Sequence, residues 1–208
     1  MHILQRKDTK PVANLFTRML RAAQLDAALY EEVEADQGAL WQATSVVVLS
    51  SLAAGIGSRG SGAGGSLIIV VLATLLGWYT WAYLTYFIGT RLLPGLRTEA
   101  DWGQLLRTIG FSSAPGVLRV IGVFLAPAWV NVIFLVVAAW MLVAMIIAVR
   151  QALDYESTAR AVAVCAVGWV IDLVISIVFL GLLSPSPHSP PAPSLAGLIW
   201  SAPAWTAL

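Results

Sequence analysis

Residues 128–149 read AWVNVIFLVVAAWMLVAMIIAV, 22 consecutive positions without a charged side chain. A bilayer core about 30 Å thick is crossed by about 20 helical residues, so this stretch predicts a transmembrane helix. Runs without Asp, Glu, Lys or Arg also cover residues 37–58, 60–90, 120–149 and 173–208. The sequence therefore predicts an integral membrane protein.

The composition agrees with this prediction and argues against other classes. Hydrophobic residues make up 59% of the 208 residues and charged residues only 11%. Soluble globular domains carry about 25% charged residues. The formal net charge of +1 supplies no basic surface on which nucleic acid would bind. We expect membrane lipids, a second copy or another membrane protein as partners, and no soluble small-molecule substrate.

Five stretches are long and apolar enough to cross a membrane: residues 40–57, 67–88, 108–126, 128–149 and 161–183. Backbone amides in lipid must be hydrogen-bonded within the segment, so we expect an all-α bundle of five transmembrane helices. The predicted organisation is a cytoplasmic N-terminal segment 1–39, a transmembrane domain 40–183 and a proline-rich external tail 184–208.

The third stretch is the least regular, because it contains Pro115, three glycines and Arg119. It either crosses the membrane or turns back as a re-entrant segment. The distribution of bases favours crossing, since cytoplasmic parts carry an excess of Lys and Arg. With five spans, ten bases lie on one side of the membrane and Arg59 alone on the other. We therefore expect a cytoplasmic N-terminus and an external C-terminus, in a prokaryotic cytoplasmic membrane.

The N-terminal segment is divided by charge. Residues 1–21 hold five bases and one acid, and residues 22–39 hold five acids and no base. Five apolar residues after Pro11 share one helical stripe: Val12, Leu15, Phe16, Met19 and Leu20. This amphipathic helix either lies on the membrane surface or packs on the protein's own cytoplasmic loops. The acidic part is expected to project into water or to meet a basic surface.

Aromatic side chains crowd the cytoplasmic end of the second stretch: Trp78, Tyr79, Trp81, Tyr83 and Tyr86. Rings at this depth usually form an interfacial belt. The alternative is a binding face for lipid or for a partner helix, because five rings exceed what anchoring requires.

Two charges, Arg119 and Asp172, fall inside predicted spans. Each lies 12 residues beyond a cytoplasmic base, Arg107 or Arg160, so both would lie about 18 Å from the same membrane face. A structural salt bridge between helices is one interpretation. A polar path for an ion or proton is a second, and an Arg119 side chain that extends independently to the interface is a third.

Nothing in the sequence predicts a catalytic or cofactor site. The run GIGSRG at 55–60 matches a dinucleotide pattern, but it lacks the strand and the acidic residue which that fold requires. His2 and His188 lie at opposite ends of the chain, so no metal site is expected. The single cysteine, Cys165, cannot form an internal disulfide. We expect no cofactor and no enzymatic activity, because catalysis needs cooperating polar groups.

Three segments resemble the Yip1 family in its prokaryotic form: LDAALYEEVEADQGALWQA at 25–43, LLRTIGFSSAPGVLRVIG at 105–122 and VRQALDYESTARAVAVCAVGWVI at 149–171. The resemblance covers residues 25–183 and implies a five-helix integral membrane protein. Eukaryotic relatives act in vesicle trafficking, bind Rab-type GTPases and partner Yip proteins, and influence membrane shape. This chain lacks their DLYGP-type motif, so the resemblance does not imply GTPase binding here.

The sequence predicts a non-enzymatic membrane scaffold or adaptor that acts through protein or lipid contacts of its charged N-terminal segment. The alternative is a small transporter or channel component in which Arg119 and Asp172 line a polar path.

Overall fold

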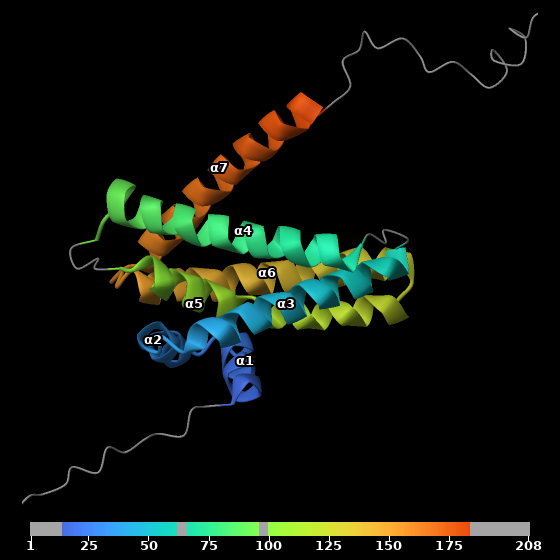
Figure 1. Ribbon diagram of the computed structural model, residues 1–208, viewed down its shortest axis with the longest axis horizontal. Coiled ribbons are helices and arrows are strands. Elements are labelled where there is room, and N and C mark those ends of the chain that lie inside the picture. Colours follow the sequence, from blue (N-terminus) through green and yellow to red (C-terminus); the bar gives the residue numbers. More distant parts are fainter. Residues whose placement is uncertain (1–13, 62–65, 96–99, 184–208) are drawn as a thin grey trace, which may run out of the picture. The chain divides into compact units, whose positions relative to one another are not determined.

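The computed structural model describes residues 14–61, 66–95 and 100–183, and within these ranges the side chains of 60–61, 172 and 175–183 are not described. The described residues form helices and no strand. In chain order the elements are α1 Leu15–Ala23, α2 Ala27–Ala35, α3 Ala39–Gly57, η1 Ser58–Ser61, α4 Leu67–Phe87, η2 Ile88–Leu92, α5 Trp102–Ser112, η3 Ala114–Phe124, α6 Pro127–Ala152 and α7 Thr158–Leu183 (Figure 1).

Three of the described helices are long and apolar enough to cross a membrane: Ala39–Gly57, Leu67–Leu92 and Pro127–Ala152. They coincide with the first, second and fourth predicted stretches, because charge-free runs of this length have no stable alternative to a helix in lipid. The chain divides into two compact units, 1–170 and 171–208. The helix α7 belongs to both units, and its residues 158–170 pack within the first.

The third predicted stretch is not one α-helix, and this prediction is corrected. The α-helical part is α5, which begins at Trp102 behind a capping box formed by Asp101 and Gln104 and ends at Ser112. The chain continues as the 3-10 helix η3, with Pro115 in its first turn. Proline lacks a backbone N–H and fits the beginning of a helix, so Pro115 favours a new start here.

The two parts together have the length of a membrane span. Eleven residues of α-helix rise about 16 Å, and eleven residues of 3-10 helix rise about 22 Å. A short α-helix followed by a tighter helix thus reaches as far as a conventional span.

Small residues face one another where α3 packs against α5 and η3, and these pairs recur along the contact. Ala43 faces Gly110, where a Cβ would lie 2.8 Å from the Ala43 Cβ, and Ser50 faces Gly116. At the far end the backbones of Gly57 and Gly122 meet, so that a Cβ on Gly122 would lie 2.9 Å from the Gly57 oxygen.

The spacing of these pairs explains why a 3-10 helix fits. From Gly116 to Gly122 is six residues, which is two turns of a 3-10 helix. From Ser50 to Gly57 is seven residues, which is about two turns of an α-helix. Both helices therefore return a small residue to their shared contact after two turns, and α3 packs more extensively on η3 than on any other element.

The helices α1 and α2 fold back against the transmembrane helices. A tight turn at Leu25, with φ 63°, joins them, and the Asp26 carboxylate caps the N-terminus of α2 by accepting from Ala28 N–H at 3.0 Å. Leu29, Tyr30 and Val33 of α2 are fully buried, in contact with α5 and α6. The helices α1 and α2 are therefore part of the folded core.

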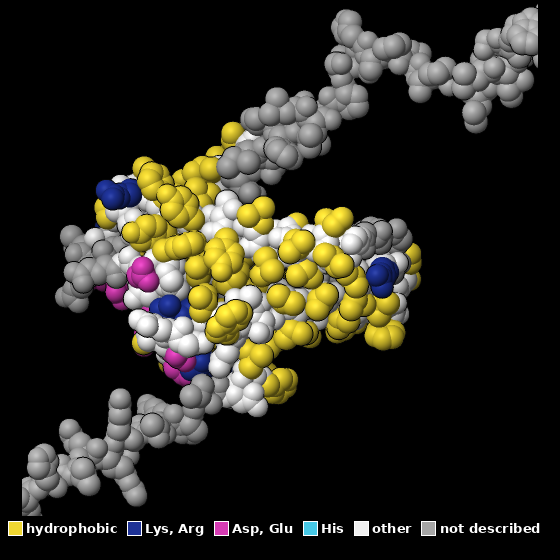
Figure 2. Space-filling model, viewed as in Figure 1, with side chains coloured by type: hydrophobic (Ala, Val, Ile, Leu, Met, Phe, Trp, Pro, Cys, Tyr) yellow, Lys and Arg dark blue, Asp and Glu magenta, His cyan; other side chains and the backbone are white. Residues whose placement is uncertain are grey.

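The surface separates into an apolar belt and a charged end (Figure 2). Large apolar side chains are exposed along α4, α6 and α7, including Ile68, Leu76 and Leu135. Acidic and basic side chains gather at one end, which we call the charged end: Arg18, Arg21, Asp26, Glu31, Glu32, Glu34, Asp36, Arg107, Arg150 and Asp154. An exposed belt of hydrocarbon over the described helices is the surface that a bilayer covers.

Candidate functional site

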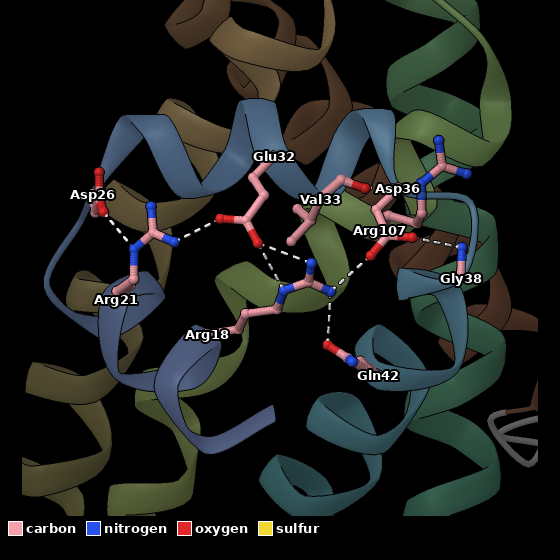
Figure 3. Close-up of polar contacts among 9 residues, drawn as sticks. All are labelled: Arg18, Arg21, Asp26, Glu32, Val33, Asp36, Gly38, Gln42 and Arg107. Atoms are coloured by element: carbon pink, nitrogen blue, oxygen red, sulfur yellow. Dashed lines mark hydrogen bonds and ion pairs between the residues drawn. The ribbon is translucent and has the colours of Figure 1, made fainter. Parts of the chain in front are cut away.

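Arg18 of α1 is the centre of a polar network at the charged end (Figure 3). Its guanidinium is only 3% exposed, and it donates to Glu32 Oε1 at 3.1 and 2.8 Å. It also lies 2.9 Å from Asp36 Oδ2 and donates to Gln42 Oε1 at 2.9 Å. One arginine therefore joins α1, α2 and the beginning of α3, which is the arrangement needed to fix a short helix against a bundle.

Arg21 extends the network to the turn between α1 and α2. It donates to Asp26 Oδ2 at 2.7 Å and to Glu32 Oε2 at 2.6 Å, so Glu32 accepts from both arginines. Hydrogen bonding to Arg21 lowers the pKa of Asp26. Burial alone would raise the pKa of Glu32, but hydrogen bonds from Arg21 and Arg18 lower it below its ordinary value. Both carboxyls are therefore held ionised.

Arg107 of α5 closes the other end of α2. It is 7% exposed, donates to the Val33 oxygen at 3.0 Å and also donates to the Glu34 oxygen. The last carbonyls of a helix lack partners within the helix and carry partial negative charge, so a guanidinium there satisfies and stabilises them. Arg107 thus caps α2 rather than facing the cytoplasm as a free base.

Beside this network is a cleft of about 480 Å³, lined by Glu31, Arg150, Gln151, Asp154, Tyr155 and Glu156. Gln151 donates to Glu31 Oε1 at 2.7 Å, which ties α2 to the end of α6. Arg150 donates to the backbone oxygens of Tyr155 at 3.3 Å and Glu156 at 3.5 Å. The lining holds three carboxylates and one guanidinium, so the cleft favours a cationic group.

Two further groups matter here: Tyr155, which lines the cleft, and Glu34 of α2, whose pKa is raised. The Tyr155 hydroxyl lies 3.1 Å from the Gly89 oxygen and 2.7 Å from the Leu93 oxygen, which ties the loop after α6 to η2 and the residue that follows it. Burial, with Asp154 and Glu31 nearby, raises the pKa of Glu34 to about 7 although Arg107 opposes the shift. Among the described residues no three His, Cys, Asp or Glu side chains converge as metal ligands.

The predicted apolar stripe of the N-terminal helix is divided by the structure. Leu15 and Met19 are half-buried, Phe16 is 71% and Leu20 50% exposed, and Val12 lies outside the described residues. The face of α1 that packs on the protein instead carries Arg18 and Ala22. One face of α1 therefore packs on the protein, and contact of the exposed part of the stripe with the membrane surface stays a prediction.

The five aromatic residues of the second stretch do not form one face. Trp78 is buried and donates to the Leu106 oxygen at 3.2 Å. Tyr79 and Tyr83 are exposed and stack edge-on against Trp102, at 6.0 and 6.5 Å between ring centroids. The rings of Trp81 and Tyr86 are half-buried, and that of Trp81 packs on Gly168 of α7. At 3.6 residues per turn these positions fall on different sides of a helix.

The structure describes the side chain of Arg119 but not that of its predicted partner, Asp172. The Arg119 guanidinium lies 5.5 Å from the centre of the Phe134 ring, and its Nε is buried without a hydrogen-bond partner among the described residues. The Asp172 side chain is outside the described residues, so their salt bridge remains a prediction.

Sequence reasoning did not find the network of Arg18, Glu32, Asp36 and Arg107, nor the cleft. One signal was available, because a segment with five bases and one acid precedes a segment with five acids. Two such segments joined by a short turn neutralise each other most easily by pairing. The capping role of Arg107 had no comparable signal.

A family model described as the Yip1 domain matches residues 27–180. The match begins with α2, includes every described element up to α6 and ends within α7. No curated protein and no solved structure matches the chain.

Proposed function

Because this chain belongs to the Yip1 domain family and is a membrane protein, we propose that it is a non-enzymatic scaffold or adaptor that binds partners at its charged end. The observation that carries the proposal is the cleft between α2, the end of α6 and the loop that follows α6. A scaffold needs a surface whose shape is kept before the partner arrives. The cleft meets this need because separate parts of the chain form its walls.

The occupant that fits the cleft is a basic segment of a second membrane protein or of a second copy. Glu31, Asp154 and Glu156 supply three negative charges, and the one guanidinium, that of Arg150, donates to backbone oxygens. An incoming Lys or Arg would therefore meet carboxylates without displacing an existing ion pair of Arg150.

The network around Arg18 supports this role by fixing α2. If α2 shifted, Glu31 would leave the cleft, and Arg18, Arg21 and Arg107 all oppose such a shift through their contacts with α2. The charged N-terminal segment contributes to binding as a rigid wall rather than as a free arm.

Charge reversal in the cleft tests the proposal. We expect Glu31→Lys to remove partner crosslinks that map to the cleft, when membranes are crosslinked and the purified protein is analysed by mass spectrometry. Gln37→Lys is the control for a lysine placed at the same end, since Gln37 is exposed and does not line the cleft. Partner crosslinks that stay unchanged in Glu31→Lys would overturn the role of the cleft. Deleting residues 1–36 is a poorer test, because the deletion also removes Arg18 and the Val33 contact of Arg107.

We further propose that the protein has five spans, with the charged end on the cytoplasmic side of a prokaryotic membrane and the C-terminus outside. In this topology α5 and η3 cross together as the third span and α7 is the fifth. In this topology ten bases lie on the side of the charged end and Arg59 alone lies on the other side. Cytoplasmic parts carry such an excess of Lys and Arg, so the count supports this orientation. The cleft is not lined by Arg119, so it gives no support to the transport alternative.

A further inference from the structure

The helix α1 presents an apolar face that no described part of the protein covers. Phe16 and Leu20 are largely exposed, whereas Arg18 and Ala22 on the opposite side are buried. A short helix normally buries its apolar face, because apolar contact is what stabilises it. Here the buried face is ionic, and the apolar face needs another neighbour.

The position of α1 along the long axis of the bundle indicates what contacts its apolar face. Trp140 Nε1 donates to the Ala23 oxygen at the end of α1, at 2.9 Å. Trp140 is 13 residues from Pro127 and 12 from Ala152, so it lies near the middle of α6. At 1.5 Å per residue, the end of α1 lies about 18 Å from the charged end of α6.

This level falls inside the bilayer. A hydrocarbon core about 30 Å thick, counted from Pro127, extends over about 20 residues of α6 and thus to about residue 147. Trp140 and the end of α1 then lie about 10 Å inside the core boundary. Figure 1 shows α1 running across the bundle rather than along it, so its beginning lies at a similar level.

The exposed face of α1 continues the apolar belt. In Figure 2 hydrophobic side chains on α1 lie next to the belt, on the side that faces away from the charged end. Figure 1 shows α4 on the opposite side of the bundle from α1, and α4 carries exposed apolar side chains along its length. On the side of α4, lipid would therefore contact the bundle along its full length. On the side of α1, α1 covers the part nearest the charged end, and lipid would contact the remaining length of about 20 Å.

The charges of α1 do not prevent this position. Arg18 and Arg21 are the described charges of α1, and Glu32, Asp36 and Asp26 pair with them. Charges inside a membrane are paired, and Arg18, at 3% exposed, faces the protein interior. Arg21, Asp26 and Glu32 are 29%, 35% and 36% exposed, so we place these side chains toward the headgroups. Because these arginines are already paired, they are not available to bind anionic headgroups.

We propose that α1 lies within the bilayer leaflet at the charged end, with Phe16 and Leu20 in contact with acyl chains, and that anionic lipid is not required for this contact. The helix then acts as a hydrophobic wedge that belongs to the folded bundle. This inference goes beyond the adaptor role, and it does not depend on any partner of the cleft.

Spin-label depth measurements test the proposal on the full-length protein. In a Cys165→Ala background, a nitroxide is attached to Phe16→Cys, to Leu20→Cys or to Ser157→Cys, and each protein is reconstituted in phosphatidylcholine vesicles with and without phosphatidylglycerol. Ser157 is the matched control, because it is exposed in the loop at the charged end. We expect the Phe16 and Leu20 labels to collide with oxygen and to be shielded from a water-soluble nickel chelate, to the same extent in both lipids.

Two results would overturn the inference. Nickel accessibility at positions 16 and 20 equal to that at position 157 would show that α1 lies in water. A depth that increases with phosphatidylglycerol would show that charge, rather than apolar contact, holds the helix. Thermal unfolding in the same vesicles identifies labelled proteins that keep the parent stability, and two label positions on α1 guard against a local disturbance at one of them.

Discussion

At the residue scale, the position of α1 against α2 and α3 depends on Arg18. It is almost fully buried and contacts Glu32, Asp36 and Gln42, which come from two different helices and the turn between them. Removing one partner of a buried ion pair leaves the other charges without compensation, and this costs more than the pair contributes when intact.

We expect Arg18→Met to lower the free energy of unfolding by about 3 kcal/mol, because Glu32 and Asp36 lose their main partner. Arg21→Met should cost about 1 kcal/mol, since Arg21 is far more exposed than Arg18. Thermal or denaturant unfolding in detergent measures both. Equal losses from the two substitutions would contradict a special role for Arg18.

Glu34 predicts a dependence of stability on pH. Its pKa in the folded protein, about 7, is above its ordinary value of 4.5 because of burial, Asp154 and Glu31. The folded state therefore binds this proton more tightly than the unfolded state does. Stability from Glu34 is complete below about pH 4.5 and is lost as the pH rises through 7.

The matched variant for this prediction is Glu34→Gln, which keeps the shape and removes the titration. We expect the parent protein to lose stability between pH 5 and pH 8 relative to Glu34→Gln, as measured by unfolding in detergent. Parallel pH profiles of the two proteins would show that Glu34 does not titrate in this range. The lowered pKa values of Asp26 and Glu32 act only at lower pH, so they do not mask the effect.

At the element scale, the junction of α5 and η3 shows where sequence reasoning reached its limit. The length and apolarity of residues 108–126 predicted a span, and Pro115 with three glycines indicated that it was irregular. The change to a 3-10 helix depends on the partner α3, whose small residues recur every seven positions while Gly110, Gly116 and Gly122 recur every six. The 3-10 helix would have been predicted only by comparing the seven-residue spacing in α3 with the six-residue spacing of these glycines.

Two glycine substitutions test this contact. A Cβ on Gly57 would collide with the backbone oxygen of Arg119, whereas a Cβ on Gly77 of α4 meets open space. We expect Gly57→Ala to destabilise by about 3 kcal/mol, because a backbone cannot yield as a side chain does. Gly77→Ala should be neutral or stabilising by up to about 1 kcal/mol. A Gly57→Ala protein as stable as Gly77→Ala, by thermal unfolding in detergent, would contradict the close packing of α3 on η3.

At the scale of the whole molecule, the sequence predicted the membrane class and the family, because both depend on properties that are local in the chain. A long charge-free run in lipid can form few structures, because its backbone must be hydrogen-bonded internally. The Yip1 match over residues 27–180 confirms the resemblance to the family. The contacts of the charged end were not predictable in the same way. They join residues such as Glu31 and Gln151, which are far apart in the sequence and meet only after folding.

In the proposed topology α5 and η3 cross the membrane together and leave the charged end on the cytoplasmic side. Single cysteines at Ala128, at the beginning of α6, and at Ser157, after its end, test this most directly in a Cys165→Ala background. With an impermeant maleimide added to intact cells, we predict that the cysteine at 128 reacts and that the cysteine at 157 reacts only after the membrane is permeabilised. Labelling of position 157, and not of position 128, in intact cells would contradict the account.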